Sequence, residues 1–181
     1  MTLNIPTELS EITLIQFMTY NQYLNSNKDI TVEQADKKLV AVMCKLTAKE
    51  VGNIPIKDYK EVVNLLRAVM EEGAKEMVPQ WNGLGFIPSL EDVSVDEYAD
   101  LENYYTEDES SIDKFVGVLY RPVVVKSLGN YSIEKYEGKI DHIDLIHQMP
   151  MNVVRAALGF FLTLRDDLLN CTLRYSSQQE K

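Results

Sequence analysis

The sequence predicts an α-dominated α+β fold with six or seven helices and one or two short β-hairpins. Apolar residues recur at helical spacing in most parts of the chain. Two short segments rich in β-branched and aromatic residues surround the turn dipeptides Asn82-Gly83 and Gly129-Asn130, which is the pattern of hairpins. Helical and extended segments do not alternate regularly, so the pattern does not favour a parallel sheet built from βαβ units.

The first part of the chain predicts helices only. Ser10 or Thr13 can cap the first helix and Thr31 can cap the second, because their hydroxyls accept hydrogen bonds from free N–H groups in a first turn. The third helix has the clearest apolar stripe, which begins after Asp58 and continues to Gly73. Glycine is common immediately after a helix, so we expect this helix to end there. These stripes indicate core-facing sides rather than cofactor pockets.

Residues 76–88 depart from the helical pattern and predict the first hairpin. Asn82-Gly83 tolerates the positive φ angles that a type I′ turn requires. Pro79 has no backbone N–H, so we expect its strand at the edge of the sheet. Ser94 and Glu97 then have the spacing of a capping box, in which each side chain bonds the backbone N–H of the other residue. A further helix is therefore expected after Ser94.

The remaining elements follow from one proline, one turn and two apolar stripes. A helix that starts near Ser111 is expected to stop at Arg121-Pro122, because the residue before a proline disfavours helical backbone. The second hairpin follows around Gly129-Asn130, and a short helix is expected over residues 141–148. The last helix is expected from about Met151 to about Leu173.

These elements indicate a single domain over residues 1–181. Its expected sub-structure is a helical part (1–74), a hairpin-containing acidic part (75–138) and C-terminal helices (139–181). The chain is 45% hydrophobic and 25% charged, the balance of a globular protein that can bury its own core. Cys44 and Cys171 are too few and too far apart for a disulfide framework, so we expect reduced thiols in the core.

Negative charge is concentrated in one stretch. The net charge is −10, and ten of the 28 acidic residues lie between Glu91 and Asp113, with no lysine or arginine among them. Such a stretch repels phosphate backbones, which argues against direct binding of nucleic acid. It is either a solvated face that keeps the protein soluble or a docking surface for a basic partner.

Three of the ten tyrosines lie within this acidic stretch. Tyrosine is enriched at interfaces because it combines an apolar ring with a hydrogen-bonding hydroxyl. A tyrosine-bearing acidic surface would suit a basic partner that also contacts aromatic rings. The predicted partner-contact residues of this stretch are Tyr98, Tyr104, Tyr105, Asp96, Asp100 and Glu102.

The C-terminal helix carries the longest apolar stretch, Val153–Leu164, which is broken by Arg155. This stretch is far below the roughly 20 residues that span a bilayer, so we expect no membrane insertion. A helix that is apolar on all sides indicates either central burial or a face offered to another subunit, including a second copy of the chain. We therefore add Phe160 and Phe161 to the predicted partner-contact residues.

The sequence contains no recognisable catalytic or metal-binding constellation. His142 and His147 are five positions apart, which would place them about 140° apart around a helix, so they would not converge on one ligand. We expect both to be surface side chains. Neither a glycine-rich phosphate loop nor a nucleophile elbow is present. The prediction is a protein without catalytic residues, metal or cofactor.

Four segments, spread between Ile5 and about Leu169, form a recognisable series. They are Ile5-Pro6 with Leu9–Leu14; Gly85–Asp92 with Glu97-Tyr98 and Asp100-Leu101; Val118–Pro122 with Tyr131, Glu134, Tyr136 and Gly138; and Met149–Met151 with Ala156–Phe161. In this order they resemble small proteins encoded among the virion and assembly genes of tailed bacteriophages, including crAss-like phages of gut Bacteroidota. The resemblance implies phage morphogenesis by protein–protein contact, either as a virion component of the head–tail region or as an assembly chaperone.

The same resemblance implies no catalytic residue and no cofactor. It implies other phage structural proteins as partners, and the host cytoplasm during assembly as the location, with the virion as a further location for a virion component. Two alternatives stay open. One is a phage regulatory protein that binds and inhibits a host factor through its acidic surface. The other is a hydrolase whose residues assemble only in space, for which His142 or His147 would be needed.

Overall fold

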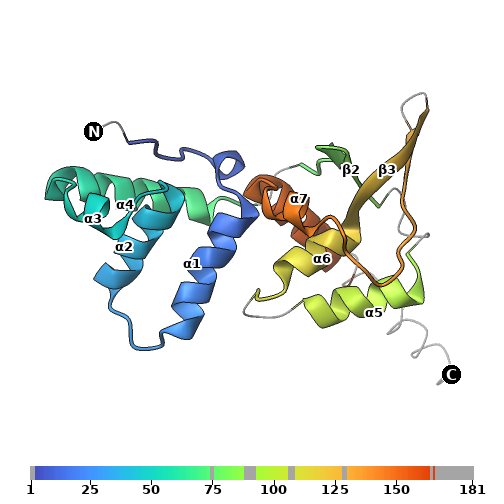
Figure 1. Ribbon diagram of the computed structural model, residues 1–181, viewed down its shortest axis with the longest axis horizontal. Helices are drawn as coiled ribbons and strands as arrows, with labels where there is room; N and C mark the ends of the chain where they lie inside the picture. The colour runs from blue at the N-terminus through green and yellow to red at the C-terminus, as the bar shows by residue number, and fades with distance from the viewer. Residues whose placement is uncertain are drawn as a thin grey trace, which may run out of the picture.

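The computed structural model describes residues 3–73, 76–87, 93–105, 109–127, 130–163 and 165. Helices predominate in these residues, and the strands form one four-stranded antiparallel sheet. The predicted α-dominated α+β class is therefore confirmed. Two lobes follow one another along the long axis in Figure 1. We call residues 3–73 the helical lobe and the described residues from 76 onward the mixed lobe.

The helical lobe contains η1 (Leu9–Glu11), α1 (Leu14–Ser26), α2 (Val32–Met43), α3 (Ala48–Gly52) and α4 (Ile56–Glu71). Thr13 and Thr31 precede α1 and α2, and each forms a capping box with a glutamine in the first turn of its helix. α4 begins at Ile56, earlier than the predicted start at Asp58. Pro55, whose φ of −55° is set by its ring, leads directly into that helix.

The mixed lobe contains β1 (Gln80–Trp81), β2 (Leu84–Phe86), α5 (Val95–Tyr104), α6 (Ile112–Leu119), β3 (Tyr120–Ser127), β4 (Asn130–Ile133) and α7 (Ile143–His147). A final helix is described over residues 151–163. Its predicted end near Leu173 lies outside the described residues, as does Cys171. Cys44 is a buried free thiol, as predicted.

The sheet joins both predicted hairpins in the order β1-β2-β3-β4. Asn82 and Gly83 turn the chain between β1 and β2 with φ angles of 45° and 83°, in agreement with the type I′ prediction. β1 lies at the edge of the sheet, next to Pro79, as expected. The pairing of β2 with β3 places Phe86 opposite Tyr120 and merges the two hairpins into one sheet.

The boundary between α6 and β3 lies earlier than predicted. α6 ends at Leu119 and β3 begins at Tyr120, so Pro122 lies within the strand and opposite Leu84. Proline restricts Arg121 to extended backbone, and the pairing with β2 carries this extended conformation back to Tyr120. The predicted end of the helix at Arg121-Pro122 is therefore wrong, because the helix already ends at Leu119.

Gly85 allows a tyrosine of β4 to lie across the sheet. A Cβ atom at Gly85 would meet Cε2 of Tyr131 at 2.5 Å, which is closer than real contacts allow. In the space that glycine leaves, the Tyr131 hydroxyl lies 2.7 Å from the Phe86 carbonyl and 2.9 Å from the Pro79 carbonyl. This contact ties β4 to the first hairpin.

One hydrophobic core continues through both lobes. Between the lobes, Thr13 forms an isolated antiparallel bridge with Pro150. The Leu14 N–H donates to the Met149 carbonyl at 2.8 Å. The residues before α1 therefore meet the residues before the final helix, and this contact closes the junction between the lobes.

Arg155, which breaks the apolar stretch of the final helix, secures the same junction. Its guanidinium donates hydrogen bonds to the Met70 carbonyl at 2.6 Å and to the Glu72 carbonyl. These carbonyls lie at the C-terminal end of α4, where backbone acceptors have no partner within the helix and a positive charge is favourable. Arg155 is therefore a helix cap that one lobe provides to the other.

Candidate contact surfaces

The predicted acidic surface is centred on α5, and buried side chains fix this helix to the mixed lobe. Ser94 and Glu97 form the predicted capping box, in which the Glu97 Oε2 accepts from the Ser94 N–H at 2.6 Å. The other oxygen of Glu97 pairs with the Arg121 guanidinium on β3 at 2.7 Å, and the two side chains are only 6% and 9% exposed. Glu97 is therefore an anchor of α5 and not part of the acidic surface.

Asp100, a predicted contact residue, also turns toward its own lobe. Its Oδ2 accepts a hydrogen bond from the Tyr136 hydroxyl at 2.5 Å. Burial, and then this carboxylate, raise the pKa of Tyr136. Of the predicted acids on α5, Asp96 and Glu102 are exposed, and the Tyr98 hydroxyl donates to Glu102 at 3.1 Å. Asp100 is half-buried and less accessible than these two acids, and its contact role stays a prediction.

Tyr104 and Tyr105, at the end of α5, line a hollow of about 160 Å³ together with Glu109. Cations of the same chain already lie over both rings. The Lys114 ammonium is 5.7 Å from the Tyr104 ring centroid, and the Arg165 guanidinium is 5.3 Å from that of Tyr105. The rings therefore make the cation contacts that the sequence predicted for a basic partner, but with their own chain.

The final helix is central to the core over residues 151–163. Phe161 is fully buried, and its ring packs edge-on against Phe115 with the centroids 5.0 Å apart. Phe160 is half-buried and packs against Phe86 at 4.9 Å. Burial in the core therefore accounts for Phe161, whose side chain does not reach the surface of the chain, whereas the contact role of Phe160 stays a prediction.

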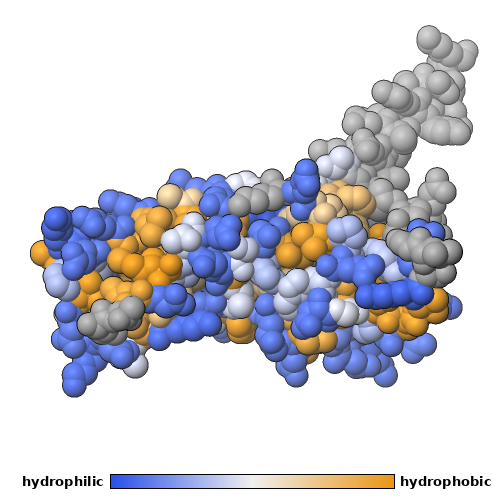
Figure 2. Space-filling view, turned by 90° about the horizontal axis from the view of Figure 1, so that it is seen from above, coloured by the Kyte–Doolittle hydropathy of each residue, from blue (hydrophilic) through white to orange (hydrophobic). Residues whose placement is uncertain are grey.

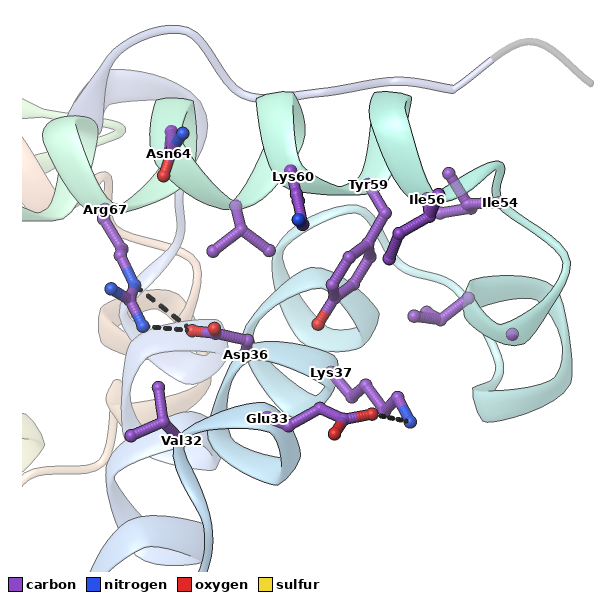
Figure 3. Close-up of a pocket in the computed structure, with 13 residues that line it drawn as sticks. Val32, Glu33, Asp36, Lys37, Ile54, Ile56, Tyr59, Lys60, Asn64 and Arg67 are labelled. Carbon is purple, nitrogen blue, oxygen red and sulfur yellow. Dashed lines mark hydrogen bonds and ion pairs between the residues drawn. The ribbon is translucent and has the colours of Figure 1, made fainter.

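An open groove of about 690 Å³, missed by the sequence analysis, crosses the helical lobe between α2 and α4, with α3 at one end (Figure 3). Val51 and Val63 are buried lining residues. Val32 and Ile56 also line the groove, yet their side chains are 68% and 69% exposed. Apolar surface that is gathered around a hollow and rimmed by charged side chains, as here, is typical of a protein-contact surface.

Three strongly exposed aliphatic residues of the chain each occupy the first position of a helix. Val32 begins α2, Ile56 begins α4, and Val95, which is 85% exposed, begins α5. A position immediately after the N-cap lies outside the apolar stripe that periodicity detects. An aliphatic residue directly after a capping residue was thus the signal available in the sequence. Seen from above, hydrophobic side chains also reach the surface over the helical lobe (Figure 2).

The acidic side chains of the groove are already paired with basic ones (Figure 3). Arg67 on α4 donates to Asp36 on α2 at 2.7 Å, and Lys37 pairs with Glu33 on the same helix at 2.7 Å. Lys60, an exposed lining residue on α4, has no ion-pair partner among the described residues. The groove therefore has one positive charge without a partner.

Tyr59 contributes a second polar group to the groove that has no partner among the described residues. Its hydroxyl points from α4 toward α2 (Figure 3), is covered from solvent, and makes no hydrogen bond within the described part of the chain. Burial, and then the charge of Asp36, raise the pKa of Tyr59, so the hydroxyl stays protonated as a donor. The unsatisfied groups of the groove are therefore a cation and a hydrogen-bond donor.

His142 and His147 are half-buried side chains, and each has a partner. His142 donates from Nε2 to the Tyr120 carbonyl at 2.7 Å. Nε2 of His147 lies 3.0 Å from Oδ2 of Asp113. Both contacts fasten the α7 region to α6 and β3, so they fit an architectural role.

Among the described residues, no group of three or more His, Cys, Asp or Glu side chains could hold a metal ion. None of the helices in the described part of the chain is long and apolar enough to cross a membrane. Comparisons with protein-family models, with curated proteins and with solved structures give no match to this chain.

Proposed function

We propose that this chain is a non-enzymatic bacteriophage morphogenesis protein that acts by protein–protein contact. In this proposal it is either a virion component of the head–tail region or an assembly chaperone. The phage context is supported by the four-segment resemblance of the sequence. The observation that carries the contact function is the groove of the helical lobe, where Val32 and Ile56 expose aliphatic side chains beside a hollow.

The outward face of α5 is a second candidate surface. Asp96 and Glu102 are exposed there, while Glu97 and Leu101 are buried and fix the helix in place. A helix that is already ordered loses little conformational freedom when a partner binds, which favours affinity. The groove and α5 lie in different lobes (Figure 1), so the chain can contact two neighbours in an assembly.

The two versions of the proposal differ in the fate of the protein. A virion component must be present in stoichiometric amounts when purified particles of the encoding phage are analysed by mass spectrometry. A chaperone must be absent from particles and must co-purify with one unassembled structural protein when the neighbouring structural genes are co-expressed. Absence from particles together with no captured structural protein would contradict both versions.

A pair of variants tests whether the groove makes the contact. Ile56→Asp places a charge on the exposed rim of the groove, and we expect it to abolish capture of the structural protein. Val124→Asp is the matched control, because Val124 is 55% exposed on β3 and lies far from the groove along the chain. Equal loss of capture in both variants would count against the groove.

The exposed acids of α5 favour one further candidate function, a phage regulatory protein that binds a host factor through its acidic surface. In that case the captured protein would be a host protein. Charge reversal at Asp96 and Glu102 would abolish capture, and Ile56→Asp would leave it unchanged.

A further inference from the structure

We infer that the groove of the helical lobe receives α5 of a second copy of this chain, so that copies associate head to tail. The inference rests on the proposed function in protein contact and names the partner of the groove.

The groove is complementary to an aliphatic side chain with a carboxylate close to it. Val32 and Ile56 expose aliphatic surface on its rim. Its acids, Glu33 and Asp36, are occupied by internal ion pairs. Lys60 has no ion-pair partner within the described residues, so an incoming negative charge would be favoured over a positive one.

The outward face of α5 has this composition. Val95 is 85% exposed, and Ala99 and Glu102, one and two turns further along, are exposed on the same side of the helix. Asp96, next to Val95, makes no ion pair or hydrogen bond within the described residues. The small side chain of Ala99 lets another backbone approach closely. α5 therefore presents an aliphatic side chain followed by carboxylates, as the groove requires.

The dimensions of the two surfaces agree. α5 has 10 residues, so its length is about 15 Å at the rise of an α-helix. The residues of α4 that line the groove run from Ile56 to Arg67, a length of about 18 Å, while α2 lines it from Val32 to Lys37. A helix laid along a groove between two other helices is a recurrent mode of recognition.

The positions of the two surfaces prevent α5 from binding the groove of its own chain, and they determine how copies can be arranged. α5 lies in the mixed lobe and α2 and α4 lie in the helical lobe (Figure 1), while the Glu97–Arg121 pair and the hydrogen bond of Asp100 fix α5 to its own sheet. The groove must therefore take α5 from another copy. Because the two contacting surfaces differ, each copy can bind two neighbours, which produces a closed ring or an open filament.

Two charge-reversed variants of the full chain test this contact, one on each surface. Lys60→Glu changes the groove, and Glu102→Lys changes α5 near its C-terminal end, where a positive charge suits the helix. Lys57→Glu is the control for the groove, since Lys57 is exposed on the same helix but does not line the groove. Glu137→Lys is the control for α5, because Glu137 is exposed outside that helix. Circular dichroism and melting temperatures establish that every variant is folded.

Sedimentation equilibrium over a range of protein concentrations gives the readout. We expect the unmodified chain and both controls to associate beyond one chain, and association to weaken at high salt. Lys60→Glu and Glu102→Lys alone should each associate about tenfold or more weakly. Their equimolar mixture should recover association, because every contact between unlike chains joins opposite charges: the unchanged α5 with the unchanged groove, and the reversed α5 with the reversed groove. The double variant, with both charges exchanged, should recover association.

Three results would overturn the inference. They are a single-chain mass at every concentration, association that neither reversal weakens, and a mixture that associates no better than its components. A monomer that still captures a phage structural protein through the groove would overturn the second copy as occupant and leave the proposed function intact. A chain that self-associates as described but captures no structural protein, and is absent from particles, would retain the inference and overturn the proposed function.

Discussion

Each lobe contains an ion pair between an arginine and a carboxylate, but the two pairs differ in their exposure to solvent. In the helical lobe, Arg67 and Asp36 form an ion pair on the rim of the groove, in which the arginine side chain is 49% exposed and the aspartate side chain 16%. In the mixed lobe, Arg121 and Glu97 form a pair that is almost fully buried between β3 and α5. Exposed pairs contribute little to stability, whereas one partner of a buried pair is costly to remove. An acidic sequence segment therefore does not by itself define an acidic surface.

The comparison predicts its largest effect at Arg121. Arg121→Met would leave the Glu97 carboxylate buried without its cation, and we expect the free energy of unfolding to fall by about 3–5 kcal/mol. Arg67→Met removes the exposed counterpart in the helical lobe and should cost only about 0–1 kcal/mol. Urea denaturation measures both values. Similar losses in the two variants would contradict the contrast between the lobes.

The junction between the lobes predicts the next effect. Arg155→Met keeps the length of the side chain but removes both hydrogen bonds to the carbonyls of Met70 and Glu72. We expect a loss of about 3 kcal/mol, because two acceptors at the end of α4 lose a charged donor. Amide hydrogen exchange should increase at the C-terminal end of α4 more than at its start. Uniform protection along α4 would show that this cap does not join the lobes.

The close approach of the Tyr131 ring to Gly85 in the mixed lobe predicts a smaller effect on stability. Gly85→Ala introduces a Cβ that meets the Tyr131 ring at 2.5 Å, and we expect a loss of about 1–3 kcal/mol from overpacking. Gly52→Ala in α3 of the helical lobe is the matched control, because nothing lies within 4 Å of the added atom there. The control should leave the melting temperature unchanged or raise it slightly. A melting temperature for Gly85→Ala equal to that of the control would rule out the steric argument.

The smallest predicted effect depends on pH and comes from Tyr136. Burial, and then Asp100, raise its pKa in the folded chain above the value of 10.0 for free tyrosine. The unfolded chain therefore loses this proton first, so the stabilisation is complete below about pH 10 and is lost as the pH rises toward the folded pKa. Tyr136→Phe should make the fall in unfolding free energy above about pH 10 less steep. Parallel pH profiles for the two proteins would contradict this.

Local features of the fold were predictable from the sequence because their partners are close neighbours. The capping box of Ser94 and Glu97 and the turn at Asn82-Gly83 involve residues a few positions apart. The pairing of β2 with β3 was not predicted, since its register depends on residues such as Phe86 and Tyr120 that are far apart in the chain.

The candidate surfaces were predicted less completely for a related reason. Tyr104 and Tyr105 were named as contact residues from their residue type; they line a hollow, and their contact role stays a prediction. Asp100 and Phe161 were named as contact residues because a sequence shows charge and apolarity but not which side of a helix faces the protein. The groove was missed because it exists only where α2 and α4 approach each other.

The bridge between Thr13 and Pro150 also imposes an order on folding during synthesis. α1 contacts α2, and α2 contacts α4, so these helices can associate soon after they are made, whereas contacts between distant residues form late. Until Met149 and Arg155 emerge from the ribosome, the backbone beside Leu14 lacks its partner and the end of α4 lacks its cap. A chain truncated before Met149 would thus leave the helical lobe incompletely covered and prone to aggregation, although that lobe contains none of the deleted residues.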